Sequence, residues 1–274
     1  RLSKIDSNYF REIYECVYNQ FSVSYLSTEK EKYNLIRVDS SMVSQASNSL
    51  LVEGIDHKNG KKSVKYSMAF DGMLPYEVKL FTSATHASED VALPEVIRSQ
   101  VKHDENHHNI YILDRGVQSA STMKDFAREA IPFIVRAKEN RKYIEIESFI
   151  TETSNVDLGS LELLKDCKVY LYRGVHLTTK KGTKRWKEEL FEVPFRLIVA
   201  RGKDDPGKEF WFITNDFDLS AKEITDAYRR RWDIEVFFCF IKQELNASHL
   251  VSLNKNGIER LCRIGTTFFD DLPS

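Results

Sequence analysis

The stretch SAKEITDAYRRRWDIEVFFCFIKQEL, residues 220–245, is the most informative part of the chain. Ser220 and Glu223 have the spacing of a capping box, in which each side chain accepts a hydrogen bond from the backbone N–H of the other. Apolar residues then recur at helical intervals. The sequence therefore predicts one helix that begins at Ser220 and runs to about Leu245.

Four polar residues lie along one edge of this predicted helix. At about 100° per residue, Tyr228, Arg231, Glu235 and Lys242 share an arc of about 60°. The arc lies beside an apolar face formed by Ala227, Ile234, Phe238, Ile241 and Leu245. Arg231 and Glu235 are also an i,i+4 pair, so a solvated salt-bridge stripe and a catalytic edge are both consistent with the pattern.

Two aspartates each follow a predicted strand. Asp39 closes the run LIRVD at 35–39, and Asp114 follows the run NIYIL at 109–113. Each aspartate alone is also a common turn former. Residues after strand ends often bind ligands in open sheets, and carboxylates are the ligands that Mg²⁺ prefers. Asp39, Asp114 and Glu235 together therefore predict a divalent-metal site.

The motif Tyr228-x2-Arg231-x3-Glu235-x6-Lys242 resembles the Y-R-E-K signature of bacterial insertion-sequence transposases of the insertion sequence 4 type. The segments around Asp39 (VDSS, 38–41) and Asp114 (ILDRG, 112–116) are similar to the settings of the first two acids in that family. The resemblance covers about residues 35–258. It implies a DDE transposase with an α/β, RNase H-like catalytic core, in which helices flank a mixed sheet.

The resemblance also implies a domain organisation. A β-rich insertion precedes the Glu-bearing helix in the family, and short strand-like runs dominate here from about Lys138 to Thr214. Both ends depart from the family pattern, which suggests a truncated transposase. The expected segments are a helical N-terminal remnant (1–34), the first part of the core (35–137), the insertion (138–214), the second part of the core (215–258) and an atypical tail (259–274).

The resemblance implies metal-dependent cleavage at transposon ends, followed by attack of the freed 3′-OH on target DNA. Asp39, Asp114 and Glu235 would hold two Mg²⁺ ions, with Mn²⁺ as a substitute. DNA would be the partner, both as terminal repeats and as target, bound by a homodimer on paired ends. Tyr228, Arg231 and Lys242 would contact phosphates, and Arg136 stands where such proteins often carry an arginine.

A basic stretch supplies further candidate DNA contacts. Residues 168–187 contain seven lysines and arginines, no Asp or Glu, and interleaved aromatics. Basic side chains pair with the phosphate backbone, and aromatic rings stack on exposed bases. The candidates are Lys180, Lys181, Lys184, Arg185 and Trp186. An exposed basic hairpin with no specific partner is the alternative.

Composition narrows the remaining possibilities. The 274 residues carry 40 Lys+Arg and 41 Asp+Glu, a formal charge of −1, which argues against a basic DNA-coating protein but not against a nucleic-acid enzyme. Four scattered cysteines fit neither a zinc ribbon nor a disulfide scaffold. No apolar run reaches the ~20 residues of a membrane span. The cysteine usage and the absence of a visible signal peptide lead us to expect a cytoplasmic location. A related metal-dependent nuclease and an inactive, at most DNA-binding remnant stay open as alternatives.

Overall fold

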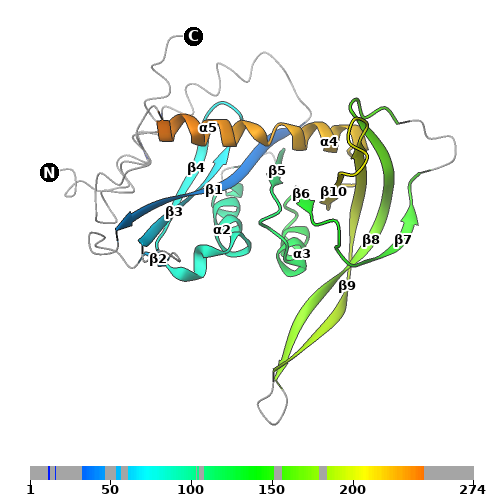
Figure 1. Ribbon diagram of the computed structural model, residues 1–274, viewed down its shortest axis with the longest axis horizontal. Helices are drawn as coiled ribbons and strands as arrows, with labels where there is room; N and C mark the ends of the chain where they lie inside the picture. Colours follow the sequence, from blue (N-terminus) through cyan, green and yellow to red (C-terminus); the bar gives the residue numbers. More distant parts are fainter. Residues whose placement is uncertain are drawn as a thin grey trace. The chain divides into compact units, whose positions relative to one another are not determined.

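A computed structural model describes residues 12, 16, 33–46, 54–56, 61–102, 104, 108–150, 156–178 and 184–243. The chain forms two compact units, one from Arg1–Asn109 with Arg231–Ser274 and the other from Ile110–Arg230. Figure 1 gives the element labels. The tail expected at 259–274 lies outside the described residues, and of the N-terminal remnant expected at 1–34 only residues 12, 16, 33 and 34 are described.

The first unit is built on an antiparallel sheet. Strand β3 (Lys61–Phe70) pairs with β1 (Asn34–Ala46), β2 (Ile55–Asp56) and β4 (Pro75–Phe81). A short 3-10 helix, η3 (Ala84–Ala87), leads into α2 (Glu89–Val101), which packs on β1, β3 and β4. Helix α5 (Trp232–Gln243) packs on β1.

The turn between β3 and β4 contains Asp71 and Gly72. The Asp71 carboxylate accepts backbone hydrogen bonds from Met73 and Leu74, both at 2.7 Å. Gly72 has a φ of 110°, and a Cβ built there would lie 2.8 Å from Nη1 of Arg37. Glycine therefore meets two requirements at this position, a left-handed backbone and close approach of a guanidinium.

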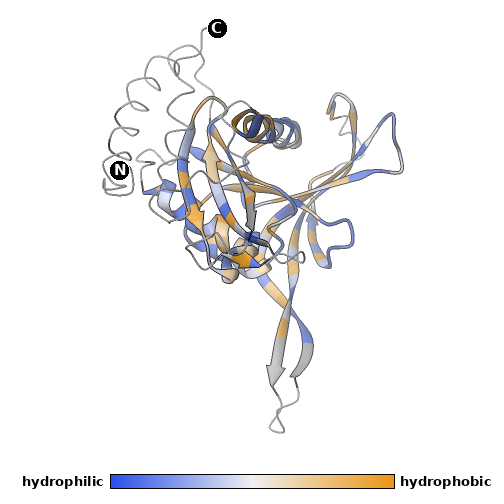
Figure 2. Cartoon of the chain, turned by 60° about the vertical axis from the view of Figure 1, so that its left-hand side comes forward, coloured by the Kyte–Doolittle hydropathy of each residue, from blue (hydrophilic) through white to orange (hydrophobic). Residues whose placement is uncertain are grey.

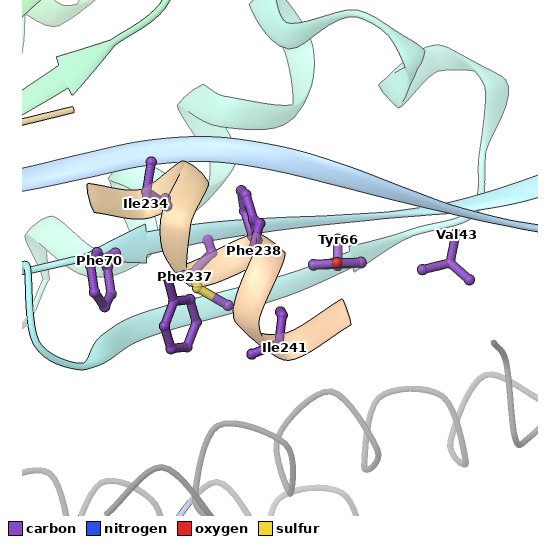
Figure 3. Close-up of a cluster of buried hydrophobic side chains, with 8 residues drawn as sticks. Val43, Tyr66, Phe70, Ile234, Phe237, Phe238 and Ile241 are labelled. Atoms are coloured by element: carbon purple, nitrogen blue, oxygen red, sulfur yellow. The ribbon is translucent and has the colours of Figure 1, made fainter. Parts of the chain in front are cut away.

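Alternation along β1 and β3 separates the two faces of this sheet. Tyr66, Met68 and Phe70 of β3 and Val43 of β1 pack against the apolar side of α5, as Figure 3 shows. Phe70 stacks on Phe237 with ring centroids 4.8 Å apart, and Tyr66 meets Phe238 edge-on at 5.6 Å. Because burying side chains of this size contributes about 1.5–3 kcal/mol each, these contacts hold α5 firmly on the strands.

The second unit contains a mixed sheet in the order β5-β6-β10-β9-β8-β7. Strands β5 (Asn109–Leu113) and β6 (Phe133–Ala137) are parallel and connected through α3 (Ala120–Arg128). The other pairings are antiparallel. They involve β7 (Tyr143–Ser148), β8 (Leu161–Thr178), β9 (Lys184–Gly202) and β10 (Glu209–Thr214), and α4 (Ala221–Arg229) follows.

Strands β8 and β9 extend beyond their neighbours as a two-stranded arm. The last partner of β7 along β8 is Leu171, and β10 reaches no further along β9 than Arg196. Among the described residues, the pairs from Arg173–Glu189 to Thr178–Lys184 therefore have no third strand beside them. Figure 1 shows this ribbon, and Figure 2 shows bands of hydrophobic and hydrophilic residues along it.

Two local predictions were wrong. Asp39 does not end a strand, because β1 continues from Asn34 to Ala46 and Asp39 lies within it, opposite Met68. The single helix from Ser220 to about Leu245 is instead two helices, since α4 ends at Arg229 and α5 begins at Trp232. The backbone N–H of Ile234 bonds to the carbonyl of Arg231 at 3.3 Å, a three-residue spacing that replaces a regular helical bond.

None of the described helices is both long enough and apolar enough to cross a lipid bilayer.

Candidate catalytic site

Asp114 stands directly after β5, as the sequence predicted. All five residues of β5 are buried, so the chain leaves the sheet interior at this carboxylate. Tyr228, on α4, donates its hydroxyl hydrogen to Oδ1 of Asp114 at 3.0 Å. The ring of Tyr228 lies against Phe212, with centroids 5.0 Å apart. Sheet and helix thus fix both partners, and the phenol holds the carboxylate in one orientation.

The start of α4 is as predicted. Ser220 Oγ accepts from the backbone N–H of Glu223 at 3.2 Å, and the Glu223 carboxylate accepts from the N–H of Ser220 at 2.7 Å. This capping box satisfies donors that the first turn of a helix leaves without helical partners. It therefore defines where α4 begins and, two turns later, where Tyr228 lies.

In the first unit, Arg231 joins the other two predicted acids. Its Nη1 donates to Oδ2 of Asp39 at 3.3 Å, and its Nη2 donates to Oε1 of Glu235. Asp39 comes from β1 and Glu235 from the first turns of α5, so one guanidinium connects strand and helix. Arg231 is only 9% exposed, which strengthens these charged contacts relative to a surface pair.

A second arginine fixes the start of α5 on β1. Nη2 of Arg37 lies 2.9 Å from Oδ2 of Asp233, and Nη1 donates to the carbonyl oxygen of Leu35 at 2.7 Å and to that of Asp71. Asp233 and Glu235 are both in the first turn of α5. The position of Glu235 is therefore set by polar contacts as well as by the apolar face of its helix.

The opposite face of β1 carries a polar cluster directly beside Asp39. The backbone N–H of Ser40 donates to Asp39 Oδ1 at 2.7 Å, whereas its hydroxyl donates to Glu89 Oε2 at 2.8 Å and lies 2.6 Å from Ser67 Oγ. Lys65, 2% exposed, places its Nζ 2.8 Å from Glu89 Oε1 and 2.9 Å from the carbonyl oxygen of Ala87. This cluster ties β1, β3 and the start of α2 together.

Arg196 of β9 and Asp166 of β8 form a buried ion pair in the second unit, and Arg196 also contacts the residue just before the α4 cap. Arg196 donates from Nε and Nη2 to the two carboxylate oxygens of Asp166, at 2.8 and 2.7 Å, and from Nη1 to the carbonyl of Leu219. Arg196 thereby connects strands β8 and β9 to the residue that precedes the helix cap. Sequence reasoning did not select Arg196, Asp166, Lys65 or Glu89, because nothing local distinguishes them from surface charges.

The remaining predicted DNA contacts are distributed over both units. Lys242 is half-buried on α5, two turns after Glu235, and Arg136 on β6 places its guanidinium 4.9 Å from the ring centroid of Phe210. Lys180 and Lys181 lie outside the described residues. Lys184, Arg185 and Trp186 belong to the end of β9 in the two-stranded arm.

The charge of the arm is partly balanced near its base. Glu189 lies 3.1 Å from Arg173 and 3.8 Å from Lys187, and Glu188 pairs with Lys142 at 2.7 Å. These acidic partners offset part of the positive charge of Arg173 and Lys187.

In a comparison with protein families, the family model described as a transposase DDE domain matches residues 30–266 of the chain. The chain belongs to this family.

The DDE transposase chain also resembles a curated protein, the probable transposase for insertion sequence element IS5377 of Geobacillus stearothermophilus. The two are 27% identical over 153 residues, which are 56% of this chain and 36% of that protein. The chain thus matches about a third of that relative's length. The chain was also matched to a cryo-EM structure of the piggyBac transposase synaptic complex with hairpin DNA. The match covers 88% of this chain and 46% of the chain in that structure, at 10% sequence identity. Its TM-score of 0.48 is too low to establish a shared fold.

The three predicted acids of this chain come from both units. Within the part of the chain that the structure describes, no group of three or more His, Cys, Asp and Glu side chains is arranged to hold a metal ion. Asp39 and Glu235 share the Arg231 guanidinium in one unit, whereas Asp114 is held by Tyr228 in the other.

Proposed function

We propose that this chain is the catalytic part of an insertion-sequence transposase of the insertion sequence 4 type. It would cleave DNA at the ends of the element and join the freed 3′-OH to target DNA. The observation that carries the proposal is that Asp39 and Glu235, 196 positions apart in the chain, both bind the guanidinium of Arg231. Membership of the DDE transposase family supports the same conclusion.

Asp39, Asp114 and Glu235 are the proposed metal ligands. Their carboxylate oxygens are what Mg²⁺ prefers, and Asp39 and Glu235 already hold a cationic group. When bound, a pair of Mg²⁺ ions, or Mn²⁺ in their place, supplies the charge that activates an attacking oxygen and stabilises a leaving oxygen. The hydroxyl of Tyr228 keeps the Asp114 carboxylate oriented through its 3.0 Å hydrogen bond.

DNA is the proposed partner, as terminal repeat and as target, with a homodimer assembled on paired ends. Arg231 and Lys242 would pair with phosphates, the arginine through two parallel hydrogen bonds and the lysine as a point charge. Tyr228 and Arg136 would contribute further contacts. The arm would follow the DNA backbone with Lys180, Lys181, Lys184 and Arg185, and Trp186 would stack on exposed bases.

The proposed core is RNase H-like, with residues 35–137 and 215–258 forming it and 138–214 inserted. The parallel β5–β6 pair with its connecting helix and the mixed sheet of the second unit support this assignment. All named elements between residues 138 and 214 are strands, as a β-rich insertion requires.

The test is a strand-transfer assay with labelled end DNA and Mg²⁺ or Mn²⁺. Asp39→Asn, Asp114→Asn and Glu235→Gln should each abolish cleavage and joining while the circular dichroism spectrum stays unchanged. Asp218→Asn, a change of the same kind at an exposed carboxylate, should retain activity. Cleavage without joining would favour the related nuclease. Wild-type protein with no metal-dependent activity, or a triad variant that still cleaves, would refute the proposal.

A further inference from the structure

We propose that Arg231 is an internal counter-cation that couples metal binding to DNA binding. It holds Asp39 and Glu235 when DNA is absent and exchanges them for a phosphate when DNA is bound. The inference rests on the proposed function, and it adds an order of events: the two carboxylates become fully available to a divalent cation only after DNA has engaged the arginine.

Without DNA, the guanidinium of Arg231 is held between two carboxylates. Both terminal nitrogens of the guanidinium are directed to carboxylates, Nη1 to Asp39 and Nη2 to Glu235. The side chain is 11% exposed, and those of Asp39 and Glu235 are 22% and 32% exposed. The guanidinium is therefore enclosed more than its partners, and its charge occupies the position between them. A cation that coordinates the same oxygens must compete with it.

Charge explains why the competition matters. Two carboxylates and one guanidinium leave one net negative charge, which is a weak attraction for a divalent ion, and the fixed positive charge repels that ion directly. A DNA phosphate offers Arg231 an alternative partner, because the planar fork of a guanidinium matches phosphate as well as carboxylate. Once Arg231 turns to the phosphate, the carboxylates regain both negative charges.

Neighbouring charges do not remove this effect. Arg37 is committed to Asp233 and to two backbone carbonyls, and Lys65 to Glu89 on the opposite face of the strand. Among the contacts of the described residues, Arg231 is a cation that Asp39 and Glu235 share at hydrogen-bond distance. Linkage is reciprocal, so a bound metal should strengthen DNA binding by the same factor by which DNA strengthens metal binding.

The experiment measures Mn²⁺ binding by electron paramagnetic resonance on the full chain, without DNA and then with a mixed-sequence duplex at low salt. Removing the charge with Arg231→Gln should tighten Mn²⁺ binding to the DNA-free chain about 10-fold, within the usual ~5–150-fold range of coupling between two sites. Duplex DNA should tighten Mn²⁺ binding to the wild type by a similar factor and leave the affinity of Arg231→Gln almost unchanged.

Arg230→Gln is the matched control, because it removes the same charge from the adjacent, exposed position. It should bind Mn²⁺ like the wild type. Should Arg231→Gln not fold, Arg231→Lys keeps the charge but offers one nitrogen in place of the two terminal nitrogens of the guanidinium, and it should give an intermediate affinity. Unchanged or weaker Mn²⁺ binding in a folded Arg231 variant would overturn the inference. Glu235→Gln separates the two proposals: if it retains wild-type Mn²⁺ affinity, the metal site itself is wrongly assigned.

Discussion

Replacing Arg196 with methionine should cost far more stability than the same change at Arg201, although both arginines pair with a carboxylate across β8 and β9. The Arg196 and Asp166 side chains are 9% and 8% exposed, with two hydrogen bonds of 2.7–2.8 Å between them. Removing one partner leaves a buried charge uncompensated, which costs about 3–5 kcal/mol. The Arg201–Glu162 pair, at 2.9 Å, is 38% and 51% exposed and should be worth about 0–1 kcal/mol.

Urea unfolding followed by circular dichroism measures the difference. With a slope of about 3 kcal/mol/M, a loss of 3 kcal/mol moves the midpoint down by about 1 M. Arg196→Met should show that shift, and Arg201→Met should stay close to the wild type. The double variant Asp166→Leu/Arg196→Met should recover much of the loss, since no unpaired charge remains. Equal midpoints for the two single variants would refute the reasoning that burial decides the worth of these pairs.

Three further predictions follow from contacts described above. Ser220→Ala should destabilise the chain by about 1 kcal/mol in urea unfolding, because α4 loses its cap, and Ser220→Asn should retain most of that stability. Lys65→Met should cost about 2–4 kcal/mol, below the full cost of breaking a buried pair because Glu89 keeps 25% side-chain exposure to water; an unchanged midpoint would contradict the role given to this lysine. Burial raises the pKa of the Cys167 thiol to about 12. The unfolded chain loses that proton near pH ~8.5, so this contribution to stability is complete below that pH and falls as the pH rises toward 12. Cys167→Ala should therefore have a flatter alkaline stability profile, and parallel profiles would rule this cause out.

Features fixed by adjacent residues could be predicted from sequence. The capping box at Ser220 and Glu223 needs only four residues, and Asp114 follows an unbroken apolar run that ends abruptly. Both predictions were confirmed. The β-turn at Asp71-Gly72 belongs to the same class, because its geometry is set by one aspartate and one glycine.

Features that depend on residues far apart in the chain could not be predicted from the sequence. The end of β1 was misplaced because Ser40 and Ser41 resemble a turn, whereas Ser40 is in fact held in the strand by Glu89 and Ser67. The interruption at Arg230 and Arg231 lies among good helix formers, so helical propensity gave no warning of it. The i,i+4 spacing of Arg231 and Glu235 predicted their pairing. The hydrogen bond from Arg231 to Asp39 could be found only from the folded structure, because the two residues are far apart in the chain.

Two consecutive residues of β1 make contacts on opposite faces of the sheet. Asp39 contacts Arg231 on one face, and Ser40 contacts the Lys65–Glu89 pair on the other. Gaining or losing one residue upstream in this strand would exchange the two faces and turn a carboxylate toward the wrong layer. Because Ile36, Arg37 and Val38 of β1 are buried, we expect the strand to tolerate conservative substitutions more readily than the in-frame insertion or deletion of one residue.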